Sequence, residues 1–404
     1  MTSIFGWLDT SEQDRRRAMD VIDLFKQRET VDELGLGHIR DTISDILSPG
    51  TSTIQTRARY FFFIPWIYMD IEKSRSDREN AAERARRREL ELIQPLMNSS
   101  DTDGVFGKQS GNSLKRLPSM AYWAGLGRLK FRLFPGVQDQ YHRALRNNRV
   151  ELRRDDSGDI ELGVGLTGNW NPHIPTKPEG FPQGITLTPT KKEADFFREQ
   201  LRMNARDSLF YQLVELNEDV PAINYPWEHP RIAEFPDSLR YWLTQAQCYA
   251  ELMHGAQLLY NLMLAEAWPK PTLIDEYQTF INEWREYVHN QLQRFESWDR
   301  TLFWRDIKRV NPRIPPAAER FSETWIKLSL SDAGRDILKW PECRSLIEDR
   351  ELRLKGARAR LRSRAHLEAW GGSSGAAKLS YRWGITRTLA QDIVNGLKTD
   401  AQAA

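Results

Sequence analysis

The segment that decides the fold is residues 239–267, LRYWLTQAQCYAELMHGAQLLYNLMLAEA. Apolar side chains fall on nearly every face of a helix drawn through it, which is typical of a helix buried on all sides. Polar residues interrupt the run at Glu251, His254, Gln257 and Asn261, so it is not expected to span a membrane. We therefore predict a long helix at the centre of a helical bundle.

The rest of the chain is also mainly helical by pattern. Apolar residues recur at helical spacing over 38–47, 190–203, 272–298 and 386–397, and a polar helix is expected from residue 341 onward. Thr190 and Glu193 have the spacing of a capping box at the start of one of these helices. The run VELRRDDSGDIELGV, residues 150–164, predicts a hairpin, because a turn separates two alternating stretches. The predicted fold class is mainly α, with multi-helix bundles and one small β-hairpin.

Composition shifts divide the chain into three predicted segments. Residues 1–148 form an N-terminal helical domain with a basic, aromatic segment. Residues 149–235 contain the hairpin, a linker rich in proline and a helix. Residues 236–404 form a C-terminal helical bundle with a basic tail.

The overall composition is that of a soluble globular protein. Hydrophobic residues make up 40% and charged residues 28% of the 404, and the net charge is only +2, so charge has to be considered region by region. The 2 cysteines lie far apart, which gives no disulfide framework and fits a reducing, cytoplasmic setting. The 14 tryptophans indicate either large helix–helix cores or stacking surfaces.

Catalytic and metal motifs are missing from the sequence. It contains no H-E-x-x-H, Walker A, G-x-S-x-G or paired Cys-x-x-Cys pattern, and its 7 histidines are scattered. We therefore expect no metal and no cofactor. The chemistry still open is the kind that needs one carboxylate to orient a water molecule.

The first candidate site is the stretch SPGTSTIQTRARYFFFIPWIY, residues 48–68, which joins a polar head to an aromatic tail. Hydroxyl residues at 51–53 are good helix caps, and a helix N-terminus can bind an anion. In this interpretation the tail anchors a helix, kinked or broken at Pro65, and the head forms a ledge for a phosphate backbone. The alternative is a capped helix whose arginines make structural ion pairs. The candidate nucleic-acid ligands are Thr51, Ser52, Thr53, Gln55, Arg57 and Arg59.

The second candidate site is the basic and aromatic segment 113–145, SLKRLPSMAYWAGLGRLKFRLFPGVQDQYHRAL. Basic groups bind phosphates, and aromatic faces stack on unpaired bases. The alternative is a basic loop over an ordinary aromatic core. The candidate ligands are Lys115, Arg116, Tyr122, Trp123, Arg128 and Tyr141.

The third candidate site is the C-terminal segment 350–388, with ten Lys or Arg against two acids. This local excess of positive charge is the strongest electrostatic signal for nucleic acid in the chain. Arg382 and Trp383, after the loop GGSSG, are the candidate ligands. The alternative is that the basic side chains pair with acidic ones elsewhere in the fold.

Five stretches carry a resemblance to a known family: FGWLD (5–9), residues 37–68, LKRLPSMAYWAGLGR (114–128), FPGVQDQYHRAL (134–145) and YNLMLAEAW (260–268). In them the whole chain resembles a bacterial family catalogued as a domain of unknown function. The resemblance implies a component of phage-defence loci, with helicases or phospholipase-D-like proteins as partners. The chain is also similar to a defence-type DNA glycosylase that removes modified bases from phage DNA.

The glycosylase resemblance fits the residues, because base excision needs neither metal nor cofactor. A carboxylate can stabilise the oxocarbenium-like sugar and activate water. Asp9, beside the aromatic FGWLD, and Asp41, in the helix before residue 48, are the candidate catalytic carboxylates, each with a purely structural alternative. Two other functions stay open: a non-enzymatic DNA-recognition subunit of a helicase or nuclease system, and a protein–protein scaffold.

Overall fold

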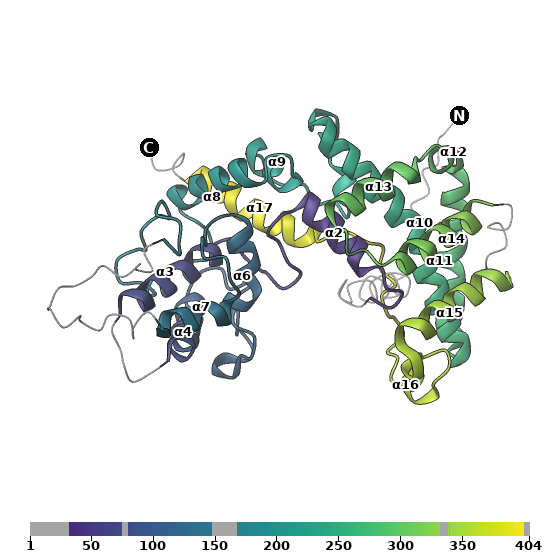
Figure 1. Cartoon of the computed structure of the whole chain (residues 1–404), viewed down its shortest axis with the longest axis horizontal. Helices are drawn as coiled ribbons and strands as arrows, with labels where there is room; N and C mark the ends of the chain where they lie inside the picture. The colour runs from purple at the N-terminus through teal and green to yellow at the C-terminus, as the bar shows by residue number, and fades with distance from the viewer. Residues whose placement is uncertain (1–31, 75–79, 148–167, 332–337, 339, 400–404) are drawn as a thin grey trace, which may run out of the picture. The chain divides into compact units, whose positions relative to one another are not determined.

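The computed structural model of the chain describes residues 32–74, 80–147, 168–331, 338 and 340–399 (Figure 1). The chain divides into two compact units. Unit 1 gathers the residues up to Ile43 and the segment Thr244–Tyr381, and unit 2 gathers Ser44–Leu243 and the residues from Arg382 onward. The chain passes from one unit to the other three times: within α2 (Gly37–Leu47), within α10 (Asp237–Ala267) and between Tyr381 and Arg382.

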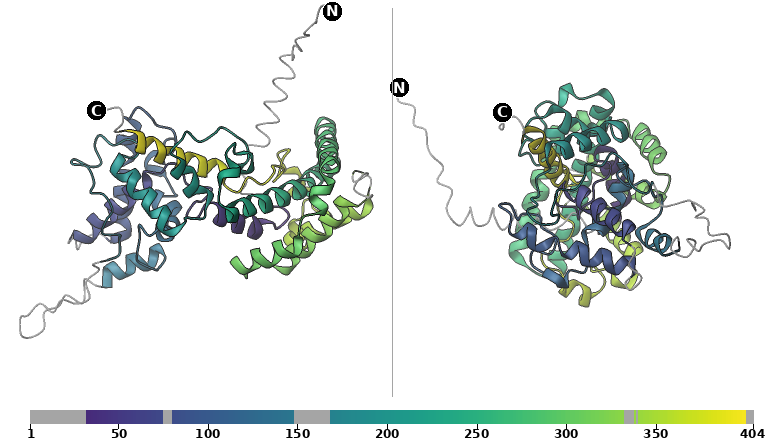
Figure 2. Two further views of the ribbon diagram at one scale, coloured as in Figure 1. Left: turned by 90° about the horizontal axis from the view of Figure 1, so that it is seen from above. Right: turned by 90° about the vertical axis from the view of Figure 1, so that its left-hand side faces the viewer.

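Unit 2 is built around α3 (Tyr60–Lys73), whose first nine residues are all buried. Helices α4 and α6 pack on α3, and α17 packs on α8 and α9. In both views of Figure 2 the yellow helix α17 lies beside teal helices, so the last helix of the chain completes a unit formed mostly by earlier residues. The other helices of unit 2 are α4 (Ala81–Leu90), α5 (Ile93–Met97), α6 (Pro118–Arg128), α7 (Gln138–Asn147), α8 (Lys191–Asn204), α9 (Leu209–Leu216) and α17 (Trp383–Lys398), with 3-10 turns at Gly111–Ser113, Pro226–Glu228 and Ile232–Glu234.

The core of unit 2 is aromatic. Phe61 and Phe62 contact Phe131 and Phe197 at ring-centroid distances between 4.9 and 6.2 Å, mostly edge to face. Such arrangements stabilise aromatic clusters beyond their buried area. Helix α3 continues through Pro65, so the predicted break does not occur; a proline at this point removes only the bond that would have ended on the Phe61 carbonyl.

Unit 1 is built around α10, which is buried on nearly all sides from Ala246 to Ala265. Helix α14 contacts α12 and α15 around it. The other helices of unit 1 are α11 (Pro271–Asn290), α12 (Leu292–Glu296), α13 (Arg300–Val310), α14 (Pro316–Leu330), α15 (Pro341–Lys355) and α16 (Arg364–Glu368), with a 3-10 turn at Gly356–Arg358.

Two indoles fix the neighbours of α10. Trp284 Nε1 donates to the Glu251 carbonyl at 2.7 Å, and Trp325 Nε1 donates to the Leu252 carbonyl at 2.9 Å. Gly255 makes the first contact possible, because a Cβ there would stand 2.3 Å from Cζ2 of Trp284. These tryptophans therefore belong to helix–helix cores, one of the two uses that the sequence left open.

The predicted mainly helical class is confirmed, and the prediction of a buried helix at 239–267 is confirmed by α10. The predicted hairpin is not supported: residues 150–164 lie outside the described residues, and those described contain no sheet, only the isolated bridge between Arg132 and Trp170. None of the described helices combines the length and apolar character needed to cross a membrane.

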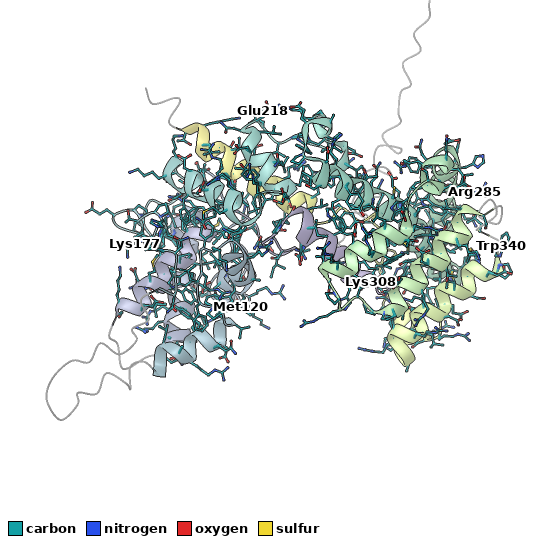
Figure 3. The ribbon with its side chains drawn as sticks, turned by 45° about the horizontal axis from the view of Figure 1, so that its top comes forward. Met120, Lys177, Glu218, Arg285, Lys308 and Trp340 are labelled. Atoms are coloured by element: carbon teal, nitrogen blue, oxygen red, sulfur yellow. The ribbon has the colours of Figure 1, made fainter. Side chains whose placement is uncertain are left out.

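The two units draw residues from more than one of the three predicted segments, and that three-segment division stays a prediction. Charged side chains such as Lys177, Glu218 and Lys308 are exposed on the surface (Figure 3).

Candidate functional site: a polar pocket over Asp392

The stretch at residues 48–68 does not begin its helix where the sequence predicted. Helix α3 begins at Tyr60, and residues 51–59 form turns. The Thr51 hydroxyl donates to the Ser48 carbonyl at 2.7 Å, and Gln55 Nε2 donates to the Gly50 carbonyl at 3.0 Å. These local bonds stabilise a loop in competition with a helix, so the predicted helix N-terminus at residues 51–53 is wrong.

Ser52 and Thr53 complete the polar head. Ser52 Oγ donates to the Ala121 carbonyl at 3.2 Å, and Thr53 is half-buried in the turn. The Thr51 and Ser52 hydroxyls are thus directed at the protein's own backbone. The ledge for a phosphate chain stays a prediction.

Arg59 lies buried against α8. Its Nε donates to Oε2 of Glu193 at 2.8 Å, and its Nη2 donates to Oε1 at 3.0 Å. The side chains of the two residues are only 6% and 4% exposed. The structural ion pair, which the sequence left as the alternative, is what the structure contains at this position.

Arg57 is held in a second buried cluster. Its Nε and Nη2 donate to the carboxylate of Asp392 in α17, at 2.8 to 3.0 Å. Its Nη1 donates to Oδ2 of Asp101 at 2.5 Å and to the Asp103 carbonyl at 2.9 Å. Oδ2 of Asp392 also accepts from the Ala58 N–H at 2.9 Å. The Arg57 guanidinium and the Ala58 N–H therefore hold the Asp392 carboxylate in one orientation.

A pocket of about 300 Å³ opens directly over this cluster. One face of α17 forms its wall, because positions 387, 388, 391, 392 and 395 lie on the same side of a helix. Arg57, Asp103 and Val220 complete the lining. The opposite side of α17 is apolar, with Leu389, Ile393 and Val394 buried in unit 2.

Burial and ion pairing shift the pKa values of the two charged groups at the floor of the pocket. It raises the pKa of Asp392 above its ordinary value, even though the hydrogen bond and charge of Arg57 act in the other direction. Burial would lower the pKa of Arg57, but the bonds and charge of Asp392 outweigh it and the pKa is raised. Arg57 thus stays cationic, while Asp392 is a buried carboxyl with an increased affinity for a proton.

The pocket wall offers polar groups to a ligand. Gln391 is bound to its neighbours: its Oε1 accepts from the Val220 N–H at 2.7 Å, and its Nε2 donates to Asn395 at 2.8 Å. Within the described part of the chain, no hydrogen bond or ion pair engages the half-buried Arg387 guanidinium. A ligand here would meet one unpaired cation, a hydroxyl from Thr388 and an exposed amide from Asn395.

The aromatic residues predicted to stack on bases are core residues instead. Tyr122 and Tyr141 are fully buried, and Trp123 and Trp383 are 7% and 3% exposed. The pattern of alternating basic and aromatic residues arises because α6 and α7 place aromatic side chains inward and basic ones outward. Trp383 Nε1 donates to the Ile223 carbonyl at 2.8 Å, which satisfies its only polar atom.

Tyr122 has a supporting position below the pocket. Its hydroxyl accepts from the N–H groups of Thr56 and Arg57 at 2.9 and 3.0 Å and donates to the Arg57 carbonyl at 2.8 Å. It thereby fixes the backbone from which the Arg57 side chain reaches Asp392.

The predicted basic ligands divide into exposed and bound residues. Lys115, Arg116 and Arg128 are exposed, and Arg128 Nη1 donates to the Asn204 carbonyl at 3.3 Å. Arg382 is half-buried, and its Nη1 donates to Oδ1 of Asp45 at 2.6 Å and to the Thr51 carbonyl at 2.8 Å. The three exposed residues remain candidates for phosphate contact.

Asp41, one of the two predicted catalytic carboxylates, is not among the residues that line this pocket. Asp41 belongs to unit 1, in α2, with a half-exposed side chain 3.0 Å from Nε of Arg40. Asp9 lies outside the described residues. Asp392 was missed, although an acid between Leu389 and Ile393 on a helix is a usable signal. Among the described residues, no three His, Cys, Asp or Glu side chains are placed to hold a metal ion.

Comparison with known proteins identifies the family of the chain. No curated protein and no solved structure matches it significantly. A family model described as "Family of unknown function (DUF6361)" matches residues 2–396. Because this match covers nearly the whole chain, the protein belongs to the DUF6361 family.

Proposed function

We propose that the protein acts on DNA and that the pocket over Asp392 receives a single extruded base, whose bond to the sugar is then hydrolysed. The observation that carries this proposal is the buried Asp392 carboxyl at the floor of a polar pocket, beside a guanidinium that stays cationic. A carboxyl in a cleft whose pKa is shifted by burial beside a charged partner is a candidate for a functional group.

The chemistry follows from these two charges. Cleavage of the C1′–N bond leaves positive charge on the sugar and negative charge on the departing base. Asp392 would stabilise the sugar and accept a proton from the attacking water, and Arg57 would stabilise the departing base. The polar side chains Thr388 and Asn395 would hold the base by hydrogen bonds to its edge, and Gln391 would hold Asn395 in place.

Binding of the DNA backbone is assigned to exposed cations of the same unit. Lys115 and Arg116 lie together in a loop before α6, and Arg128 lies at the end of that helix. If Lys115 and Arg116 each contact one phosphate, replacing both with alanine should reduce the slope of log affinity against log salt by about 2. A slope equal to that of the unchanged protein would remove these residues from the interface.

The cellular setting of this activity follows from the resemblance. We place it in the cytoplasm, in defence against phage, alongside helicase or phospholipase-D-like proteins. Cys248 and Cys343 are both free and buried, which fits a reducing compartment.

A second function is favoured by one observation. Both oxygens of Asp392 already accept hydrogen bonds, from Arg57 and from the Ala58 N–H. In this second function the carboxylate would act only by positioning Arg57. The protein would then be a DNA-recognition subunit that binds a base in the pocket without cutting it.

Alkaline cleavage of treated DNA separates these functions. Purified protein is incubated with unmodified DNA and with phage DNA that carries different base modifications, and abasic sites are revealed by strand cleavage in alkali. Base excision predicts alkali-labile sites in at least one modified DNA. Intact strands on every substrate, together with salt-sensitive binding, would leave recognition alone.

Two variants test the pocket itself. Asp392→Asn should abolish excision, and Glu199→Gln, a half-exposed acid of the same unit that pairs with Arg202, should leave it unchanged. Because Asp392 also neutralises Arg57, a thermal unfolding curve must show that the variant is folded at the assay temperature. Arg387→Ala removes a cation without a partner in the described structure, so it should weaken binding while preserving the fold.

A further inference from the structure

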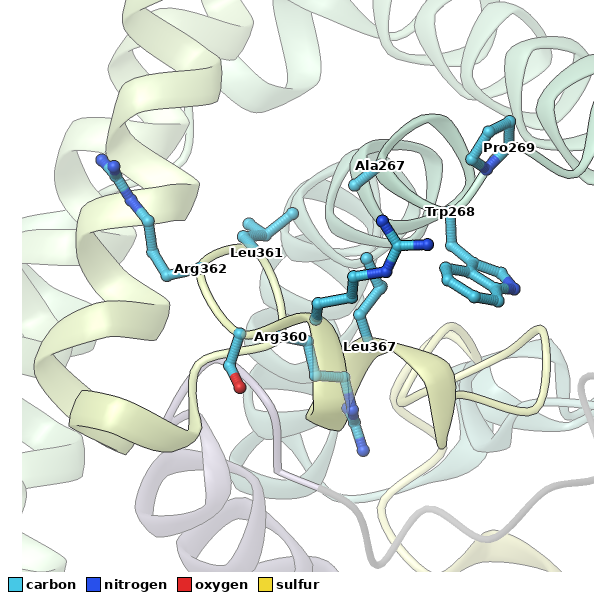
Figure 4. A pocket seen from close by; sticks show the side chains of 9 residues that line it. Ala267, Trp268, Pro269, Arg360, Leu361, Arg362 and Leu367 are labelled. Atoms are coloured by element: carbon cyan, nitrogen blue, oxygen red, sulfur yellow. The ribbon is translucent and has the colours of Figure 1, made fainter.

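A second pocket, of about 680 Å³, lies within unit 1. Figure 4 shows Trp268 and Pro269, which follow the end of α10, on one side of it and Arg362 on the other. The side chains that line it include three arginines, at positions 360, 362 and 364, and no acid. It therefore combines positive charge with an aromatic face.

Hydrogen bonds to a buried carboxylate hold the loop that carries these arginines. The N–H groups of Arg360 and Leu361 each donate to the carboxylate of Glu351 at 3.0 Å, and this side chain is fully buried. The Arg360 side chain is bound at 2.5 Å to Oε1 of Glu33 and at 2.9 Å to Oγ of Ser374. A site held in this way loses little conformational freedom when it binds a ligand.

All three arginines pair with an acid, but Arg360 is only 25% exposed in its pair with Glu33, so the exposed guanidinium donors come from Arg362 and Arg364. Nε of Arg362 lies 2.7 Å from Oε1 of Glu348, and Nε of Arg364 donates to Oε1 of Glu368 at 3.2 Å. Within the described part of the chain, the Nη groups of these two residues have no partner. Their side chains are 62% and 82% exposed. Each guanidinium is oriented through Nε and presents two donors outward.

Trp268 supplies the other half of the site. It is half-exposed, and the guanidinium carbon of Arg364 lies 5.4 Å from the centre of its ring. A planar ring beside a cation is the arrangement on which a nucleobase stacks, with its phosphate held by arginine. A simple anion would need the arginines but not the indole.

We propose that this pocket of unit 1 binds a nucleotide, with its phosphate on Arg362 and Arg364 and its base stacked against Trp268. The nucleotide is either a free molecule or one unit of a single strand, because both present the same groups. This site is independent of the pocket over Asp392, and it does not rest on base excision.

Binding to the full chain tests the proposal, with Trp268 contributing to the fluorescence that is followed. The probes are adenosine monophosphate, inorganic phosphate and a short oligodeoxyadenylate. Arg364→Ala should weaken nucleotide binding by about tenfold or more, since each charged hydrogen bond is worth at least that factor. Arg353→Ala is the matched control, because it removes an exposed arginine of the same unit away from the pocket.

Trp268→Leu tests the stacking. It should remove the preference for adenosine monophosphate over inorganic phosphate and leave phosphate binding unchanged. Binding of the mononucleotide supports a free ligand, and binding of the oligomer alone supports a strand, and both support the site. The proposal is overturned if no probe binds at millimolar concentration, or if Arg362→Ala and Arg364→Ala bind like Arg353→Ala.

Discussion

The buried ion pair between Arg59 and Glu193 gives a stability prediction that can be worked out from its contacts. Arg59→Met keeps the length of the side chain but removes its charge and its donors. The variant loses the bidentate pair with Glu193, at 2.8 and 3.0 Å, and the bond from Nη1 to the Thr186 carbonyl at 2.9 Å. Glu193 is then left as a buried carboxylate without a cation.

The expected loss of unfolding free energy is about 3–5 kcal/mol, the range measured when one partner of a buried pair is removed. Most of this loss comes from the desolvated carboxylate that remains, so a second change should restore part of it. In Arg59→Met/Glu193→Gln no buried charge is left. The double variant should therefore be more stable than the sum of the two single losses predicts. It keeps some loss, because the Thr186 carbonyl is left without its Arg59 donor, whereas a glutamine oxygen at position 193 can still accept from the Thr190 N–H.

The assay is urea unfolding followed by circular dichroism, with each transition fitted separately because the chain has two units. Arg202→Met is the matched control: Arg202 lies on the same helix, α8, and pairs with Glu199 three residues away, but both side chains are about half exposed. An exposed pair of this kind contributes little, so its midpoint should stay unchanged.

A loss below about 1 kcal/mol for Arg59→Met would refute the reasoning, because it lies within the range of an exposed pair. Additive losses in the double variant would also contradict it, since they would show that the two side chains do not interact.

Two further predictions concern the cores of the units. Burial raises the pKa of Glu89 to about 7, above the ordinary 4.5, so its contribution to stability is full below pH 4.5 and is lost as the pH rises through 7. Glu89→Gln should remove up to about 3 kcal/mol of that pH dependence, measured as urea midpoints at pH 5 and pH 8; the same slope in both proteins would contradict this. In unit 1, Gly255→Ala forces a Cβ against Trp284 and should cost about 1–3 kcal/mol. Gly384→Ala in α17 of unit 2, with open space around it, should lower the melting temperature little or not at all. Equal melting temperatures for the two alanine variants would show that the Trp284 ring moves aside.

The sequence predicts most helices well, because a helix depends on neighbours three and four residues away. The predicted capping box of Thr190 and Glu193 is confirmed with both of its hydrogen bonds. The final helix was expected over 386–397 and runs over Trp383–Lys398. The predicted helix 272–298 is two helices, α11 and α12, because the chain turns at Gln291.

The candidate site could not be predicted in the same way, because its partners are distant in sequence. Arg57 and Asp392 are 335 residues apart, and no local pattern indicates that they meet. The sequence does not show which acidic residues contact Arg57 and Arg59. It therefore left open whether these arginines bind a ligand at the surface or form structural ion pairs. The same limit made Tyr122 look like a stacking residue, when its hydroxyl supports the backbone at Arg57.

The place of α17 in the chain has a consequence for synthesis on the ribosome. Residues 244–381, most of unit 1, leave the exit tunnel after Arg57 and before Asp392. Until α17 follows, the Arg57 guanidinium lacks its main counter-charge, and α8 and α9 lack a helix that packs on them. Unit 2 therefore cannot complete its fold until residues 244–381 and then α17 have been synthesised.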